Sequence, residues 1–323
     1  MRTVAFFAAA CAALAALATP ALAQKWPEKP IKLVVPYPPG GNVDTAARIV
    51  APGMQEALGQ PVIIENKPGA GGIIAGEFVA KSPADGYTVF FMANSPLLHA
   101  PIIFNRPAYH WDKDFTPVSS VSFTPIALLV HPTTPVKSVR ELLDLAKKEP
   151  GKLTLATPSA GTTNHLLSEL LQSLTGASWL TVHYKGNAPA STAMLAGEVQ
   201  MSFEQVSVSL PFIKQGRVRA LAVTVDKRVS SLPDVPTFEE AGVKGMEGAT
   251  FTGIVAPTGT PKAVIARMQS ALARVLAEKS VIDKFDALGA EARATTPEQF
   301  HGYLKAEYEK WTPVIMKANI RAN

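Results

Sequence analysis

Two loops in this sequence place glycine, hydroxyl and amide side chains directly before a helical pattern. The first loop, Pro36–Asp44, follows the apolar run Ile31–Val35, and the second loop, Thr157–His165, follows the run Leu153–Ala156. A helix N-terminus has backbone N–H groups without internal partners and a partial positive charge, so such a turn attracts anions. Taken alone, each loop is better explained as an ordinary strand–helix connection or a helix cap. The presence of two such loops favours a binding site for an anion.

Polar residues also stand at the ends of two predicted strands. Asn94 and Ser95 follow the nearly continuous apolar run Tyr87–Met92, and Glu204 follows the run Val199–Phe203. In open α/β sheets, ligands bind in crevices at the carboxyl ends of the strands. A simple turn accounts for Asn94 and Ser95 equally well. Glu204 is explained either as a residue at the rim of a cleft or as a solvated strand end.

The sequence gives little support to a catalytic site. It has no G-x-S-x-G nucleophile elbow, and its six histidines lack the H-E-x-x-H spacing of a zinc site. His165 follows Ser159 and Thr162 closely enough for a serine–histidine pair, although capping and packing explain these residues better. Glu204 could act as a general base, but no second carboxylate can be assigned to it. We therefore predict no catalytic residue and no metal site.

The glycine-rich segment Gly69–Gly72 is a candidate for a nucleotide-binding turn. A dinucleotide fingerprint needs a third glycine where this chain has Ile74, and the Gly-Lys-Ser/Thr ending of a P-loop does not follow. The glycines are better explained by a tight turn and a close helix approach. We predict no cofactor.

An α/β framework must position these loops. Strand and helix patterns alternate, and nearly continuous apolar strands are typical of a parallel sheet that is buried on both faces. Two long extended segments, Phe115–Pro132 and Thr250–Pro257, are expected to cross between two domains. Pro52 lies inside the first helical pattern and is expected to bend that helix or end it near Arg48.

Two further helix starts are predicted from capping residues. Thr237 with Glu240 predicts a short helix that ends at Gly242. Thr260 is expected to be an N-cap with Pro261 at the first helical position.

The N-terminus has the pattern of a cleavable secretory signal. Arg2 precedes an apolar run that is shorter than the ~20 residues that span a bilayer, and an Ala-x-Ala site ends at Ala23. We therefore expect residues 1–23 to be removed and the mature protein to be periplasmic. Cys11, the only cysteine of the chain, lies in this segment, so no disulfide is expected. The basic residues are scattered, so no nucleic-acid partner is expected.

Short motifs occur in a characteristic order along nearly the whole mature sequence. They are Trp26–Ile31, Pro36–Asp44, Glu65–Gly72, Ala84–Thr88, Gly161–His165, His183–Gly186, Leu221–Thr224, Leu232–Thr237, Glu240–Gly242 and Ala256–Pro261. Each motif is weak alone. Their number and order resemble those of the Bug family of periplasmic solute-binding proteins, the receptor component of tripartite tricarboxylate transporters.

The resemblance implies a two-domain α/β fold of the periplasmic-binding-protein (Venus-flytrap) class, type II-like, with two interdomain crossings. It implies domain I at residues 24–123 plus 251–323 and domain II at residues 124–250. In the family, the first loop and the hydroxyl-rich loop of the second domain hold a ligand carboxylate, partly through water. The ligand-binding residues expected on this chain are Tyr37, Pro39, Gly40, Gly41, Asn42, Asp44, Asn94, Ser95, Ser159, Ala160, Gly161, Thr162, Thr163, His165 and Glu204.

The leading hypothesis is a periplasmic receptor that acts as a monomer. It would bind a small di- or tricarboxylate, amino acid or aromatic carboxylate and deliver it to the subunits of a membrane transporter. Glu204 stands where family members often carry Asp, and the longer acid could alter cleft size or ligand preference. Two alternatives remain open: a periplasmic sensor that presents the same ligand to a signalling kinase, and a secreted hydrolase.

Overall fold

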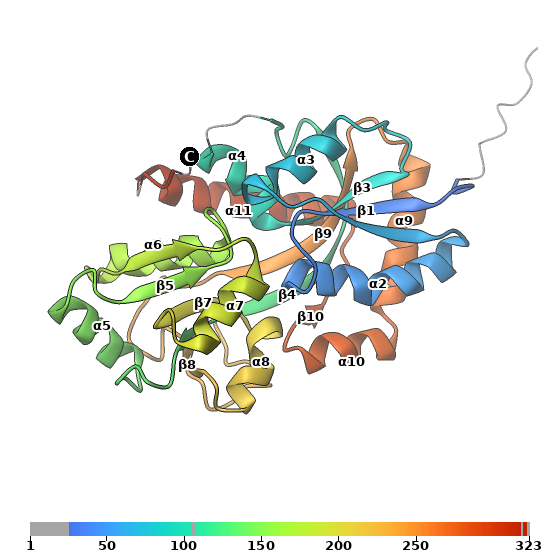
Figure 1. Cartoon of the computed structure of the whole chain (residues 1–323). Helices are drawn as coiled ribbons and strands as arrows, with labels where there is room; N and C mark the ends of the chain where they lie inside the picture. The colour runs from blue at the N-terminus through green and yellow to red at the C-terminus, as the bar shows by residue number, and fades with distance from the viewer. Residues whose placement is uncertain (1–25, 105–107, 318, 322–323) are drawn as a thin grey trace, which may run out of the picture.

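A computed structural model of the chain describes residues 26–104, 108–317 and 319–321. The predicted signal segment, residues 1–23, lies outside these described residues. Within them, one curled sheet of ten strands has the order β2-β1-β3-β9-β4-β7-β5-β6, and β8 and β10 also pair with β4. Helices cover both faces of this sheet, and the molecule divides into two halves (Figure 1).

The strands and helices alternate along most of the chain, as the sequence predicts. The strands are β1 (Ile31–Val35), β2 (Val62–Asn66), β3 (Thr88–Ala93), β4 (Phe115–Val130), β5 (Thr154–Thr157), β6 (Leu180–His183), β7 (Met201–Gln205), β8 (Arg219–Val223), β9 (Ala249–Pro257) and β10 (Glu291–Ala292). The helices are α2 (Asn42–Leu58), η1 (Ala70–Gly72), α3 (Ile73–Ala80), η2 (Ser95–His99), α4 (Ala100–Ile103), α5 (Val139–Lys148), α6 (Thr163–Thr175), α7 (Asn187–Ala196), α8 (Val206–Lys214), α9 (Lys262–Leu276), α10 (Lys279–Ala287) and α11 (Pro297–Lys317).

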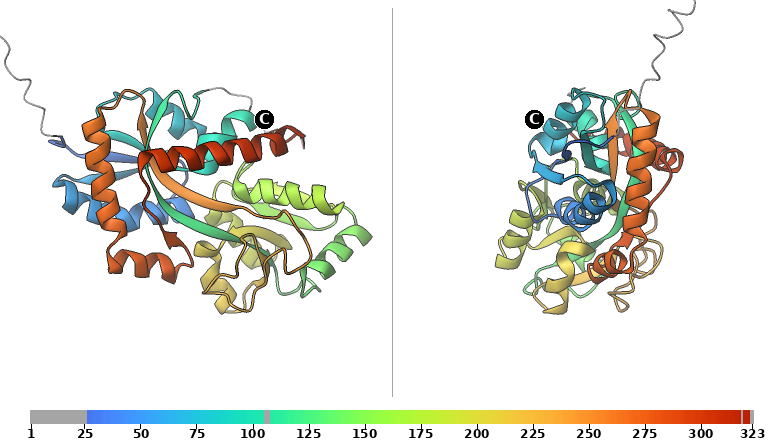
Figure 2. Two further views of the ribbon diagram at one scale, coloured as in Figure 1. Left: turned by 180° about the vertical axis from the view of Figure 1, so that it is seen from behind. Right: turned by 90° about the vertical axis from the view of Figure 1, so that its right-hand side faces the viewer.

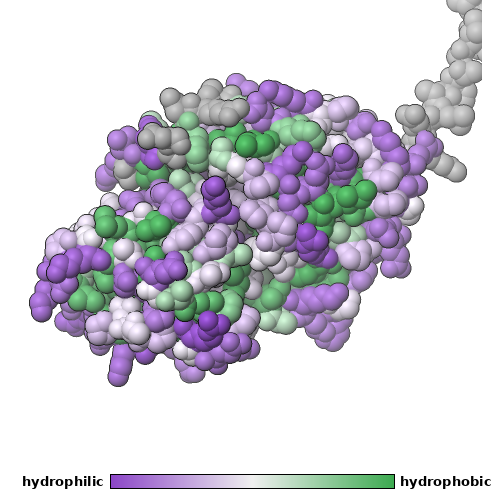
Figure 3. Space-filling model, viewed as in Figure 1, coloured by the Kyte–Doolittle hydropathy of each residue, from purple (hydrophilic) through white to green (hydrophobic). Residues whose placement is uncertain are grey.

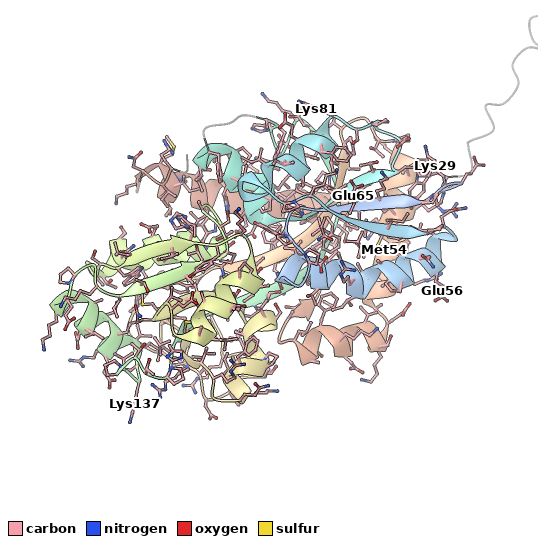
Figure 4. The ribbon with its side chains drawn as sticks, in the orientation of Figure 1. Lys29, Met54, Glu56, Glu65, Lys81 and Lys137 are labelled. Atoms are coloured by element: carbon pink, nitrogen blue, oxygen red, sulfur yellow. The ribbon has the colours of Figure 1, made fainter. Side chains whose placement is uncertain are left out.

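In the first half, β1 pairs in parallel with β2 and β3, and β3 pairs antiparallel with β9. Successive side chains of a strand point to opposite faces of the sheet. Phe91 of β3 accordingly packs with α2 and α9 on one face, whereas Phe90 packs with α3 and η2 on the other. In Figure 4, Met54 of α2 lies toward the sheet and Glu56 lies on the outer side of the helix. Burial on both faces explains the continuous apolar sequence of β3.

The second half repeats this layered arrangement around β4, β5 and β7. β5 pairs in parallel with β6 and β7, and the end of β4 pairs antiparallel with β7 and β8. Leu128 of β4 packs with α5 and α6, and Leu129 packs with α7 and α8. The carboxyl ends of β5, β6 and β7 therefore carry the loops that face the first half.

Strand β4 joins the two halves. Residues Phe115–Pro125 pair with β9, and residues Ile126–Val130 pair with β7 and β8. β9 makes the return connection, as predicted for this segment. A third connection was not predicted: α11 packs Phe300 into the core of the first half and Trp311 into the core of the second. Figure 2 shows α11 extending along the back of both halves.

Three local predictions were wrong in whole or in part. α2 does not end near Arg48, because Pro52 lies on the exposed side of the helix, where water can satisfy the carbonyl group that loses its N–H partner. The capping bonds between Thr237 and Glu240 do form, but only turns follow them. The N-cap of α9 is Pro261, and the hydroxyl group of Thr260 donates to the Pro257 carbonyl oxygen instead.

Candidate ligand-binding site

A small cavity lies between the two halves, at the N-termini of three helices. Asn42, Thr163 and Asn187, the first residues of α2, α6 and α7, all line it. Its volume is about 20 Å³, which is room for about one water molecule. This inner cavity is lined by Tyr37, Asn42, Val43, Ala93, Asn94, Ser95, Pro158, Thr162, Thr163, Asn164, Asn187, Gln205 and Thr250.

The inner cavity is neutral in formal charge but electropositive in character. Among the described residues that line it, none carries a charged side chain. Each helix N-terminus instead contributes unpaired N–H groups and the positive end of a dipole equivalent to roughly half an elementary charge. The arrangement suits an anion that is held by dipoles rather than by an ion pair.

Asp44 holds the first loop in shape. Its carboxylate accepts hydrogen bonds from the Gly40 N–H (2.9 Å), from Arg48 Nε (2.8 Å) and from Asn66 Nδ2 (2.9 Å). Burial alone would raise the pKa of Asp44, but these hydrogen bonds outweigh burial and hold the pKa below its ordinary value. Asp44 therefore remains ionised, and its hydrogen bonds stabilise the conformation of the first loop.

Asn42 lines the inner cavity and has one unpaired hydrogen-bond donor. Its Oδ1 accepts from Thr124 Oγ1 at 3.1 Å and from Ser207 Oγ at 2.7 Å, which join it to the other half. Its Nδ2 is buried and has no partner. A buried donor without a partner costs about 1–3 kcal/mol, so this atom favours a ligand with an acceptor.

The second loop is held by its own helix and by the first half. Thr162 is the N-cap of α6 and accepts from the His165 N–H at 3.4 Å. His165 Nδ1 in turn accepts from the Gly161 N–H at 3.0 Å. The hydroxyl group of Ser95, in the first half, donates to the Gly161 carbonyl oxygen. The loop is therefore fixed across the cleft in this conformation.

A buried amide network fixes Asn187 at the floor of the cavity. Asn187 Nδ2 donates to Glu204 Oε1 at 2.6 Å and to Gln205 Oε1 at 2.8 Å. Gln205 Nε2 donates to Asn164 Oδ1 at 3.0 Å and to Thr250 Oγ1 at 2.9 Å. Burial raises the pKa of Glu204 to about 7, although hydrogen bonds from Gln205, Asn187 and Ser191 oppose this shift.

Hydrogen bonds to residues outside the inner cavity also fix the side chain of Asn94. Its Nδ2 donates to the Ala249 carbonyl oxygen at 3.2 Å and to Glu307 Oε2 of α11 at 3.4 Å. Its Oδ1 accepts from Thr163 Oγ1 at 3.4 Å, across the cleft. The structure thus connects the cavity to the C-terminal helix.

A larger outer cavity of about 370 Å³ adjoins the inner one. Tyr37 and Pro158 line both cavities. Burial raises the pKa of Tyr37 above its ordinary value, so its hydroxyl group stays protonated. The outer cavity is lined by Tyr37, Pro38, Pro68, Gly69, Ala70, Gly71, Gly72, Pro158, Ser159, Tyr184, Lys185 and Gly186.

The structure brings about half of the expected site residues to the two cavities and places the others around them. Tyr37, Asn42, Asn94, Ser95, Thr162 and Thr163 line the inner cavity, and Ser159 lines the outer one. Pro39 and Gly40 are exposed at the tip of the first loop, and Gly41 lies against Asn187. Asp44, Ala160, Gly161, His165 and Glu204 are buried within or behind the two loops.

Sequence reasoning missed Asn187, Gln205, Asn164 and Thr250 as cavity residues. Asn187 follows a strand and Gly186 and begins a helix, which is the same pattern that identified the first two loops. That signal was available in the sequence. Gln205 and Thr250 come together only through the pairing of β7 and β9 with β4.

The described residues contain no group of three or more His, Cys, Asp or Glu that could hold a metal ion. In the same residues, no helix is both long and apolar enough to cross a membrane. On the face that Figure 3 shows, hydrophilic side chains are spread over both halves and hydrophobic ones lie between them.

Solved structures define the class of this molecule. It superposes on R. palustris Rpa4515 with adipate at a TM-score of 0.88 and 34% identity, covering 92% of this chain and 99% of that one. The periplasmic binding protein BugD gives a TM-score of 0.87 at 34% identity, with coverage of 92% and 100%. MatC from Rhodopseudomonas palustris with bound malate gives 0.86 at 31% identity, with coverage of 90% and 100%. The fold is the two-domain α/β fold of periplasmic binding proteins.

The family follows from the sequence match. The model of the tripartite tricarboxylate transporter family receptor matches residues 46–320. The chain therefore belongs to this family of solute-binding receptors, and the predicted resemblance is confirmed.

Proposed function

We propose that this protein binds a small carboxylate between its two domains and delivers it to a membrane transporter. One observation carries the proposal: Asn42, whose Nδ2 is a buried donor without a partner, lines a cavity at three helix N-termini. A carboxylate oxygen would satisfy this donor and gain the helix dipoles. The adipate and malate in the neighbouring structures support the same ligand class.

Binding requires the two halves to move apart and close again. The inner cavity of about 20 Å³ is too small for any carbon skeleton with a carboxylate. Asn42, Ser95 and Asn94 are bonded across the cleft, so the conformation described is a closed one. The ligand would enter an open form and shift the equilibrium toward closure.

The proposed function also implies where the protein acts and what happens to its ligand. We infer that residues 1–23 direct export to the periplasm and that the protein releases its ligand unchanged, as a receptor rather than an enzyme. We also propose that residues 24–123 plus 251–323 form domain I and that residues 124–250 form domain II. The change of partners within β4, after Pro125, supports this division.

A thermal-shift screen over small carboxylates tests the proposal. A carboxylate present at 100 times its Kd should add about 2.7 kcal/mol to the free energy of unfolding. For a protein of this size, that corresponds to a rise of several degrees in Tm. The methyl ester of the same acid is the matched control and should give no shift. If no carboxylate raises Tm, or if esters raise it equally, carboxylate binding is contradicted.

A further inference from the structure

A groove of about 420 Å³ lies behind the two strands that join the halves, and we call it the back groove. Its base is formed by Phe123, Pro125 and Ala249 of β4 and β9. The neighbouring residues Thr124 and Thr250, which pair with each other, face the cleft: Thr124 bonds a residue of the inner cavity, and Thr250 lines that cavity. Because successive side chains of a strand point to opposite faces, β4 and β9 separate the back groove from the cleft.

Each half of the molecule supplies one wall of the back groove. Residues 286–293, around the turn between α10 and β10, form the wall of the first half, and residues 225–230, after β8, form the wall of the second. The two halves meet at the floor, where α8 lies beside α10 (Figure 1) and a Cβ at Gly289 would lie 2.6 Å from Val206 Cγ1. The next residue, Ser207, bonds Asn42 of the inner cavity at 2.7 Å. This contact therefore also lies between the back groove and the cleft.

Above the floor, the two walls are not bonded to each other. Arg293 Nη2 pairs with Glu291 of its own wall at 2.6 Å, and Arg228 Nε pairs with Glu240 of its own half at 2.9 Å. Among the described residues of the two walls, no hydrogen bond or ion pair reaches from one wall to the other. The width of the back groove is therefore set by the angle between the halves and not by contacts across it.

Opening of the cleft must narrow the back groove. Each half has its own hydrophobic core, so the halves move as bodies about the strands that join them. The strands and the floor contact lie between the cleft and the back groove. A rotation about them that separates the two sides of the cleft brings the two walls of the back groove together.

We propose that the back groove sets the balance between the open and closed forms. In the closed form it has room for an added side chain, whereas in the open form its walls approach and that room is lost. Bulk placed in the groove therefore favours the closed form. Because apparent affinity rises with the fraction of protein in the form that binds, the same bulk should also strengthen ligand binding. This inference rests on the opening and closing in the proposed function, but its test needs no ligand.

Two substitutions fill the back groove from different sides. Ala249→Phe adds a ring at the base, and Ser230→Phe adds one on the wall of the second half. Ala249 is half-buried and Ser230 is exposed, so neither ring has to enter a packed core. Ala277→Phe is the matched control, because Ala277 is exposed at the end of α9 and lies outside the groove.

A pair of spin labels on the mature protein measures the opening directly. Cys11 is the only cysteine of the chain and lies in the segment that we expect to be removed. Labels at Glu56→Cys on α2 and Ala196→Cys on α7, both exposed, therefore report one distance across the cleft. In the ligand-free protein, each groove-filling variant should lower the ratio of long to short distances by at least about fivefold, the effect of modest overpacking in the open form. The control should leave this ratio unchanged.

Urea unfolding identifies the variants that fold, and a shift toward short distances in either folded groove-filling variant, without one in the control, supports the inference. An unchanged ratio, a shift toward long distances or an equal shift in Ala277→Phe would overturn it. A natural protein that shows only the short distance without ligand would also overturn it, because there would be no open form to oppose. If no carboxylate binds in the thermal-shift screen, the proposed function fails, and the distances still decide the role of the back groove.

Discussion

At the scale of single residues, Gly41 controls how closely the halves approach. Its φ of −88° suits any residue, so its only special property is the missing side chain. A Cβ at this position would lie 2.8 Å from Asn187 Oδ1, which the bonds to Glu204 and Gln205 hold in place. Closure thus depends on a contact with one amide oxygen.

We predict that Gly41→Ala lowers affinity for a carboxylate by about tenfold and changes the free energy of unfolding by less than about 1 kcal/mol. The added methyl group opposes the closed form and leaves both cores intact. Calorimetric titration together with urea unfolding separates the two effects. Unchanged affinity would contradict the role of Gly41 in closure.

The sequence predicted part of the site, and its failures have a physical reason. Asn42 and Thr163 were predicted because a strand, a small-residue loop and a helix start can be recognised locally. Gln205 and Thr250 were not, because nothing local brings residues 45 positions apart into a hydrogen bond. Their contact requires the order of strands in the sheet, which one sequence does not specify.

At the scale of elements, the sequence likewise predicted the helices and strands better than it predicted how they pack. The helices and buried strands follow from hydrophobic periodicity, and β4 and β9 were predicted as long extended segments. The position of α11 was not predicted, because an amphipathic pattern shows that a helix is covered but not by which domain. Thr237 and Glu240 form their capping bonds without a helix, since Gly242 ends the segment before a second turn can form.

We predict that Gly302→Ala in α11 stabilises the protein by roughly 0.5–1 kcal/mol. Gly302 lies inside the helix, and a Cβ there meets no atom within 4 Å, so alanine gains helix propensity without a clash. Gly216→Ala is the matched control. The Cβ of this residue would also meet open space, but its φ of +69° disfavours alanine, so it should destabilise. Urea unfolding that ranks these two variants in the opposite order would contradict this account.

At the scale of the whole molecule, the cleft gathers buried polar groups between the two halves. Its amides, hydroxyl groups and one acid are held between two cores that α11 and two strands join. Burial strongly disfavours the ionised form of Glu204. This side chain is only 3% exposed and has no cationic partner among the groups that bond it. Its ionisation therefore acts against folding.

We predict that Glu204 makes the folded protein less stable as pH rises. Because its folded pKa of about 7 lies above the ordinary value of 4.5, the folded state binds more protons between these values. The stabilisation is complete below about pH 4.5 and is lost by the time the pH has passed 7. The separation of the two pKa values corresponds to roughly 3 kcal/mol.

The Glu204→Gln variant removes this ionisation and keeps an acceptor for Asn187. Relative to the natural protein, it should gain stability from pH 5 to about pH 7 in urea unfolding, and the difference should level off by pH 8. Glu56→Gln removes an exposed carboxylate from the outer side of α2 as a charge-matched control (Figure 4). Asp44, whose pKa is lowered, contributes with the opposite sign in both variants and cancels in the comparison. Parallel stability profiles for Glu204→Gln and the natural protein would show that this carboxyl group has nearly the same pKa in the folded and unfolded states, and would contradict the prediction.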